Sequence, residues 1–287
     1  MKIKKYFETK SKIIDRALNG YLPAGKSKLI TAMRYSLFAG GKRFRPILML
    51  AIAQCFHKND KTVLAAACAM EMIHTSTLIH DDLPAMDDSD LRRGKPTNHK
   101  VFGEDLAVLA GDALINEAYL LLARELPAAQ SAQIAKLFAD AIGTQGVIEG
   151  QVLDLEAEGK TLKLSELRKI HSLKTGALLE ASVSSAAVLA KAKPAQLLAL
   201  KRYSQALGLA FQIRDDILDA VGDQKQLGKS QTDQRNQKQT YVKILGVKGA
   251  ELACEREIKI AKDALQQIGF ERSALNDLID FVGSRKN

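Results

Sequence analysis

Apolar residues recur with the period of an α-helix along most of the chain, and the strict alternation of a half-buried strand is almost absent. The periodic segments predict helices over residues 28–39, 43–56, 61–82, 104–125, 131–154, 165–190, 195–220 and 250–268. Residues that interrupt helices, such as Pro127 and Pro194, separate these segments. Composition does not shift along the chain, so we expect one all-α domain over 1–287, a single large helical bundle. The polar stretch 222–239 is expected to be a loop or lid between helices.

The chain is basic, with 42 Lys and Arg residues against 33 Asp and Glu residues and a formal net charge of +9. The basic residues are scattered and not interleaved with aromatic residues, so we expect no nucleic-acid partner and an affinity for small phosphate compounds. Uninterrupted apolar runs such as Ile47 to Ala53 are much shorter than the ~18 residues of a membrane span. The five lysines of residues 1–12 lead into no apolar stretch, unlike a secretory signal. We therefore expect a cytoplasmic protein without stable membrane insertion.

The three cysteines, Cys55, Cys68 and Cys254, lie among apolar neighbours and form no Cys-x-x-Cys pair. Free cysteine behaves as a small apolar residue, and an odd number without this spacing is not typical of a disulfide or metal framework. We expect all three to be core thiols.

An acidic cluster follows the apolar segment from Val63 to Ile79. It reads Asp81-Asp82-Leu83-Pro84-Ala85-Met86-Asp87-Asp88, with Asp90 beyond it. Pro84 cannot continue a helix without losing a hydrogen bond and clashing with the preceding turn, so the chain should leave helical geometry near Asp82. The turn should then bring Asp87 back toward Asp81, which an uninterrupted helix would place about 120° apart.

A second acidic cluster lies inside a predicted helix, in the run from Phe211 to Asp219. Asp215 and Asp219 are four residues apart and Gln212 precedes Asp215 by three, so the three side chains form one stripe. Like charges at this spacing repel each other, and burial without partners would raise the cost to the order of several kcal/mol. The cluster therefore needs cations.

Lysine and arginine side chains or divalent metal ions could supply these cations. Donor sets made only of oxygen favour Mg²⁺, which binds a few carboxylates together with water and substrate phosphate. One such cluster is most often a solvated helix face, but two clusters within apolar helices favour a metal site.

Basic residues near glycine could form the other half of a phosphate site. They are concentrated in Gly40-Gly41-Lys42-Arg43-Phe44-Arg45-Pro46 and in Arg92-Arg93-Gly94-Lys95-Pro96. Guanidinium groups match phosphate oxygens in pairs, whereas lysine acts as a point charge. Lys174 and Lys229 also lie beside glycine-containing turns but carry less weight, because an isolated lysine is most often a surface residue.

In this order the motifs resemble those of the short-chain trans-polyprenyl diphosphate synthases, the farnesyl and geranylgeranyl diphosphate synthases. The resemblance covers roughly residues 35 to 246. Besides the two basic motifs, it rests on Glu-Met-Ile-His at 71–74, Leu-Ile-His-Asp-Asp-Leu-Pro-Ala-Met-Asp at 78–87, Ala-Gly-Asp at 110–112, Lys-Thr-Gly at 174–176 and Phe-Gln-Ile-Arg-Asp-Asp-Ile-Leu-Asp at 211–219. It implies an all-α fold of the isoprenoid-synthase type, usually a homodimer, with both Asp motifs facing a deep central cavity.

The resemblance also assigns roles to individual residues. It implies that carboxylates of both motifs hold a three-ion Mg²⁺ cluster on an allylic diphosphate: Asp81, Asp82, Asp87, Asp215, Asp216 and Asp219. It implies that the same diphosphate contacts Arg92, Lys174, Thr175, Gln212 and Lys229. Isopentenyl diphosphate would contact Lys42, Arg45, His74 and Arg93.

The reaction that the resemblance implies is ionisation of the allylic diphosphate, attack by the isopentenyl double bond and loss of a proton. It needs no nucleophilic side chain, which suits a sequence without a Ser-His-Asp or Cys-His arrangement.

Product length depends, in the family, on the residues before the first Asp motif. The fifth residue before Asp81 is usually aromatic in bacterial farnesyl synthases and forms the floor of the cavity; here it is Ser76, followed by Thr77. A smaller floor favours C20 geranylgeranyl diphosphate, whereas the Pro84-Ala85 expansion of the motif favours a shorter product. The overall pattern favours C15 farnesyl diphosphate. The segment after Lys229 lacks a glycine that the family commonly has, which leaves the contacts of the lid open.

Four other functions are compatible with parts of the sequence. A terpene cyclase usually carries a different second motif, and a metal-dependent phosphohydrolase using His80 and Asp81 would leave the basic motifs unexplained. An inactive helical partner subunit is marked by loss of one Asp motif, and both are present here. Nucleic-acid binding would rest on net charge alone.

Overall fold

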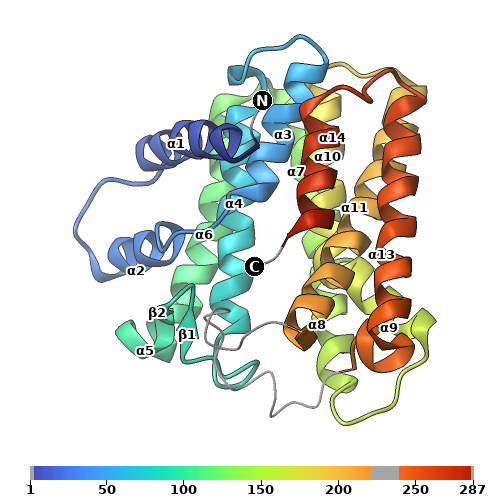
Figure 1. Cartoon of the computed structure of the whole chain (residues 1–287). Helices are drawn as coiled ribbons and strands as arrows, with labels where there is room; N and C mark the ends of the chain where they lie inside the picture. Colours follow the sequence, from blue (N-terminus) through green and yellow to red (C-terminus); the bar gives the residue numbers. More distant parts are fainter. Residues whose placement is uncertain (1–2, 222–238, 286–287) are drawn as a thin grey trace. The chain divides into compact units, whose positions relative to one another are not determined.

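The computed structural model describes residues 3–221 and 239–285, which form helices with one short hairpin (Figure 1). The elements are α1 (Ile3–Tyr21), α2 (Lys28–Leu37), α3 (Phe44–Cys55), α4 (Lys61–Asp81), β1 (Leu91–Arg92), β2 (Lys95–Pro96), α5 (Asn98–Phe102), α6 (Glu104–Glu125), α7 (Ala128–Ile142), α8 (Val147–Glu156), α9 (Leu164–His171), the π-helix η1 (Ser172–Gly176), α10 (Ala177–Leu189), α11 (Pro194–Val221), α13 (Tyr241–Gln266) and α14 (Ala274–Ser284). The predicted all-α fold is confirmed.

The described residues fall into two compact units. The first holds residues 3–47 and 64–135, and the second holds residues 48–63, 136–221 and 239–285. The lid predicted over 222–239 lies, apart from residue 239, outside the described residues.

The first unit contains α1, α2, most of α4, the hairpin, α5 and α6. Helix α2 begins where the Ser27 side chain accepts a hydrogen bond from the backbone N–H of Ile30, which satisfies one of the free donors at a helix start. Helix α2 contacts α5 and α6, and α5 also contacts α6. The antiparallel hairpin pairs Leu91 with Pro96 and Arg92 with Lys95, and it lies next to α5 in Figure 1.

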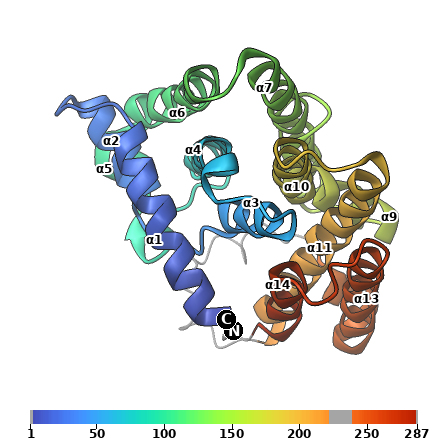
Figure 2. The same ribbon diagram turned by 90° about the horizontal axis from the view of Figure 1, so that it is seen from above.

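The second unit is built around α11, which packs against α13 and also contacts α10 and α14. The three helices α11, α13 and α14 stand side by side in both views (Figure 2). Pro194 begins α11, a position where its missing N–H costs nothing. Thr240 caps α13 by accepting a hydrogen bond from the N–H of Lys243. The long helix α11, which carries the second acidic cluster, is therefore held by neighbours on several sides.

Helix boundaries differ from the sequence prediction in several places; α5 was not predicted, and α13 begins at Tyr241 and not at residue 250. The segment predicted as 131–154 is divided into α7 and α8 by a turn over residues 143–146, in which Gly146 has a non-helical backbone conformation. The segment 165–190 is interrupted by η1. Helix α1 was not predicted because it buries only a narrow stripe, Tyr6, Lys10, Ile14 and Leu18, in a lysine-rich segment. Helix α14 was also missed.

Two of the described helices are long and apolar enough to cross a membrane, although neither is an uninterrupted apolar run. They are α4, with 72% of its apolar window buried inside the protein, and α6, with 39% buried. Core helices pass the same test, so length and hydropathy are weak evidence for a span. The core-thiol prediction is confirmed for Cys68 and Cys254, whereas Cys55 is half-buried; all three are free.

Candidate active site

The first acidic cluster forms a tight turn at the end of α4. The helix ends at Asp81, and the backbone N–H of Asp87 donates to the carbonyl of Asp81 at 2.9 Å. The predicted return of Asp87 toward Asp81 is therefore confirmed, and both side chains lie in half-exposed positions. Two carboxylates are thus carried on one short turn beside solvent.

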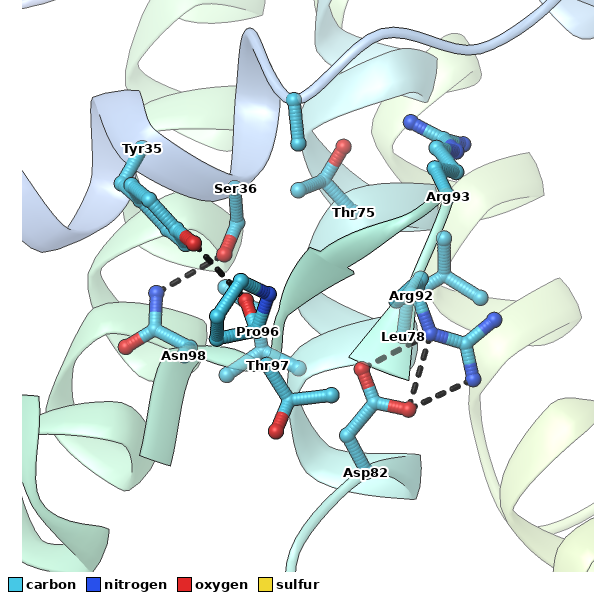
Figure 3. Close-up of a pocket in the computed structure, with 12 residues that line it drawn as sticks. Tyr35, Ser36, Thr75, Leu78, Asp82, Arg92, Arg93, Pro96, Thr97 and Asn98 are labelled. Atoms are coloured by element: carbon cyan, nitrogen blue, oxygen red, sulfur yellow. Dashed lines mark hydrogen bonds and ion pairs between the residues drawn. The ribbon is translucent and has the colours of Figure 1, made fainter. Parts of the chain in front are cut away.

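Asp82, between them in sequence, has a different environment (Figure 3). Its carboxylate is only 3% exposed and accepts three hydrogen bonds from Arg92, at 2.6–2.8 Å. Burial raises the pKa of Asp82, and the bonds from Arg92 oppose that rise. Both oxygens of Asp82 accept from one guanidinium group, so Asp82 holds Arg92 in place, and the metal role of Asp82 stays a prediction.

A second guanidinium, that of Arg93, is held by the glycine pair of the first basic motif. Arg93 donates to the carbonyl of Gly40, and a side chain on Gly41 would lie 2.5 Å from the Arg93 guanidinium carbon. Gly41 also has φ +118°, a conformation that glycine adopts without strain. Only glycine at this position therefore permits the close approach of Arg93.

Arg45 and His74 lie together near Arg93. Arg45 Nη1 is 3.3 Å from His74 Nε2. Desolvation and the Arg45 charge lower the pKa of His74 well below its usual range, so the ring is neutral at physiological pH. Desolvation also lowers the pKa of Arg45, to about 10, so Arg45 remains charged. Lys42 is exposed on the same loop, and the four residues predicted to hold isopentenyl diphosphate thus all belong to the first unit.

Arg43, the last residue of that loop before α3, is a structural residue. Its buried guanidinium donates to Asp15 of α1 at 2.8 Å, to Glu71 of α4 at 2.9 Å and to the carbonyl of Leu37 at 2.7 Å. It adopts φ +48°, which is uncommon for a residue with a side chain. Arg43 therefore fixes the loop against three helices.

The second acidic cluster lies on α11, where helical spacing brings Gln212, Asp215 and Asp219 onto one stripe as predicted. Asp216, on an adjacent face, accepts a hydrogen bond from the backbone N–H of Tyr241 at 2.7 Å. This bond ties the cluster to the first turn of α13. Asp215 lies 3.0 Å from Arg285, the residue directly after α14.

Lys174 and Thr175 project from η1, which lies against both α8 and α11. Lys174 pairs with Asp154 of α8 at 2.6 Å. A side chain on Gly150 would meet the backbone nitrogen of Lys174, and one on Gly208 would lie 3.2 Å from Gly176 Cα. Gly208 lies four residues before Gln212 and thus on the same stripe of α11. The Lys-Thr-Gly turn is therefore seated at the start of the second acidic cluster.

A family model described as polyprenyl synthetase matches residues 26–284. The chain belongs to this family. Among its relatives, farnesyl diphosphate synthase of Geobacillus stearothermophilus is 42% identical over 99% of this chain and 98% of that protein. Geranylgeranyl diphosphate synthase of Cyanophora paradoxa is 43% identical over 98% and 96%. An FPP/GFPP synthase from Zymomonas mobilis has a solved structure similar to this one, with a TM-score of 0.88, 34% identity and 98% of each chain covered.

As a polyprenyl synthetase, the protein is a prenyltransferase.

Three residues near the predicted site were not identified from the sequence. Asp154 could have been found as an acid within an apolar helix, four residues after Gly150. Gln151 is buried, and neither of its side-chain polar atoms has a hydrogen-bond partner among the described residues. The residues next to Arg285 in sequence form no motif that would predict its contact with α11.

The two residues predicted to set product length differ in exposure. Ser76 is fully buried and donates to the carbonyl of Ile73 at 2.7 Å. Thr77 is half-exposed, donates to the carbonyl of His74 and lies four residues before Asp81, hence on the same side of α4. Lys229 lies outside the described residues.

The donor chemistry of both clusters fits Mg²⁺. Within residues 3–221 and 239–285 no three acidic, His or Cys side chains gather closely enough to enclose a metal ion. Mg²⁺ does not require such a cage, because it binds one or two carboxylates and completes its octahedral shell with water and substrate phosphate. The paired turn of Asp81 and Asp87 and the stripe of Asp215 and Asp219 provide carboxylates in that number.

Proposed function

We propose that this prenyltransferase condenses isopentenyl diphosphate with dimethylallyl and geranyl diphosphates to give (2E,6E)-farnesyl diphosphate and diphosphate. One observation carries the proposal. His74, within the arginine cluster, and Asp81, at the carboxylate turn, lie seven residues apart on α4. Seven residues are nearly two helical turns, about 10 Å along one side of the helix. An anion site and a candidate metal site therefore share one face of one helix.

The basic residues would bind and orient isopentenyl diphosphate. Lys42, Arg45 and Arg93 supply the positive charge, and neutral His74 adds a hydrogen-bonding group without further repulsion. Because Arg43 fixes the loop that carries Lys42 and leads into Arg45, these two side chains require little ordering when the substrate arrives.

On the allylic substrate, the C–O bond to diphosphate breaks and its electron pair leaves with the diphosphate. Arg92, Lys174, Thr175 and Gln212 would stabilise the departing charge, together with Lys229. Mg²⁺ bound by the carboxylates of both motifs would supply further stabilisation of that charge. The isopentenyl double bond then attacks the allylic carbocation, and the released diphosphate accepts the proton that is lost.

We propose that all described residues belong to a single catalytic domain and that it acts as a cytoplasmic homodimer without membrane insertion. The exposed face of α6 supports dimerisation, since Leu109 and Leu120 are 56% and 53% exposed there, and exposed apolar patches favour association. Light scattering after size exclusion should give twice the chain mass of 31.3 kDa. Leu109→Glu should give the monomer mass.

The reaction is tested by incubation with isopentenyl diphosphate, Mg²⁺ and each of the C5, C10 and C15 allylic diphosphates, with products identified by mass. We expect a C15 diphosphate from the C5 and C10 substrates and no condensation in EDTA. Release of phosphate without condensation would instead support a phosphohydrolase, and no turnover would support an inactive partner subunit.

A C20 product is the second candidate, favoured by the small side chain at Ser76 and by the geranylgeranyl synthases among the relatives. Ser76→Phe should then shift product toward shorter chains. Thr77→Phe is the matched comparison, because Thr77 lies on the Asp81 side of α4 whereas Ser76 is buried on another face. An unchanged profile in the first variant and a shortened one in the second would assign the floor to Thr77.

A further inference from the structure

Arg285 stands out because it is a buried cation that neither the sequence motifs nor the proposed reaction uses. Its side chain is 9% exposed, and its Nη1 lies 3.0 Å from Asp215 Oδ1. The guanidinium carbon lies 4.5 Å from the centre of the Phe211 ring. Phe211 precedes Asp215 by one helical turn on α11, so the ring and the carboxylate flank Arg285 from one side of the helix.

Arg285 and Asp215 form an ion pair without two parallel hydrogen bonds between the guanidinium group and the carboxylate. Arg285 Nε and Nη1 are both buried without a hydrogen bond of good geometry, although Nη1 is within ion-pair distance of Asp215. A guanidinium normally donates two parallel bonds to a carboxylate, which adds energy and fixes geometry. Arg285 therefore contributes positive charge beside Asp215 without forming these two parallel bonds to it.

We propose that Arg285 is a resident counter-ion of Asp215, which orients this carboxylate before metal arrives and which Mg²⁺ must displace. The inference rests on the proposed function in one respect, that Asp215 binds Mg²⁺. An arginine cannot lose its charge in a protein, so the exchange is a competition between two cations for the same carboxylate oxygens. The cation–π contact with Phe211 gives Arg285 a second partner that remains when Asp215 turns to metal.

Removal of Arg285 should therefore have opposite effects on the metal-free and the metal-bound protein. In EDTA, Arg285→Gln should lower the melting temperature by about 2–4 °C, because Asp215 loses its counter-ion. The same variant should bind metal more tightly, because the competing cation is gone. We expect the half-saturating Mn²⁺ concentration to fall about three- to tenfold.

The measurement uses the full chain, Mn²⁺ and inorganic diphosphate, with free Mn²⁺ followed by electron paramagnetic resonance. Lys262→Gln is the matched control: it removes the same charge from the pair of Lys262 with Asp280, which joins α13 to α14 at the surface. It should leave Mn²⁺ binding and melting temperature close to wild type. Arg285→Lys keeps the charge and should bind Mn²⁺ as the wild type does.

The outcomes separate this inference from the proposed function. Unchanged or weaker Mn²⁺ binding in Arg285→Gln, with normal binding in the wild type, would overturn the counter-ion role alone. Tighter binding in Arg285→Lys equal to that in Arg285→Gln would also overturn it, because charge would not be the cause. A wild-type protein that binds no Mn²⁺ would overturn both proposals.

Discussion

The two acidic clusters use the same residue type in different structural settings. The first is a turn after a helix end, and the second is a stripe within an intact helix. In each, the second aspartate of the Asp-Asp pair accepts hydrogen bonds from the protein: Asp82 from the Arg92 side chain, Asp216 from the Tyr241 backbone. The comparison teaches that the second aspartate positions another element, a guanidinium in one cluster and a helix start in the other.

The first aspartates, Asp81 and Asp215, should show the largest effects. Substitution of either by Asn removes the charge of a predicted metal ligand but little volume. Steady-state condensation rates at saturating Mg²⁺ should fall about 10²–10³-fold in both variants. If either variant kept a rate within tenfold of wild type, its cluster would not be needed for ionisation.

Substitution of the second aspartates, Asp82 and Asp216, should lower the free energy of unfolding by different amounts in the two clusters. Asp82→Asn replaces a buried carboxylate that pairs with the half-buried Arg92 by an amide, and it should lower the free energy of unfolding by about 2–3 kcal/mol. Asp216→Asn keeps an oxygen that can accept from the Tyr241 N–H and should cost less than about 1 kcal/mol. Urea unfolding monitored by circular dichroism measures both, and equal losses would contradict the difference between the two clusters.

Acid should destabilise the protein through two desolvated histidines, His74 of the first unit and His171 of the second. Desolvation lowers the pKa of His171 to about 4, and desolvation and the Arg45 charge lower the pKa of His74 well below its usual range. The unfolded chain takes up protons near pH 6.5 while the folded chain does not, so stability falls as pH decreases below that value. His171 alone should account for about 2 kcal/mol between pH 7 and 5.

His171→Phe keeps an aromatic ring beside Tyr241. In this variant the free energy of unfolding should fall by about 2 kcal/mol less between pH 7 and 5 than in the wild type, as measured by urea unfolding at a series of pH values. A slope as steep as that of the wild type would show that His171 titrates normally in the folded protein.

Gly150 and Gly208 allow close approach to η1, and their substitution tests how tightly α8 and α11 pack against it. A methyl group at Gly150 would meet the Lys174 backbone, whereas one at Gly208 would lie 3.2 Å from Gly176 Cα. Gly150→Ala should cost about 1–3 kcal/mol and lower the condensation rate by moving Lys174, and Gly208→Ala should cost less. Thermal melts of both variants compare the two losses of stability. A larger loss in Gly208→Ala would show that η1 packs more tightly against α11 than against α8.

Much of this organisation could be predicted from sequence because it follows from local rules. Pro84 dictated the turn that returns Asp87 to Asp81, and helical spacing dictated the stripe of Asp215 and Asp219. The partners of Asp82 and Asp216 depend on which distant segments fold against them, and no spacing rule supplies that. The same holds for Arg285, which lies 70 residues from Asp215 along the chain.

A double-variant cycle tests the central claim, that both acidic clusters act on one diphosphate. Condensation rates are measured for Asp81→Asn, Asp215→Asn and the double variant under identical Mg²⁺ and substrate concentrations. Residues that act as a unit lose function non-additively, so the double variant should be close to the slower single variant. Multiplied losses in the double variant would contradict the claim, because each cluster would then contribute independently.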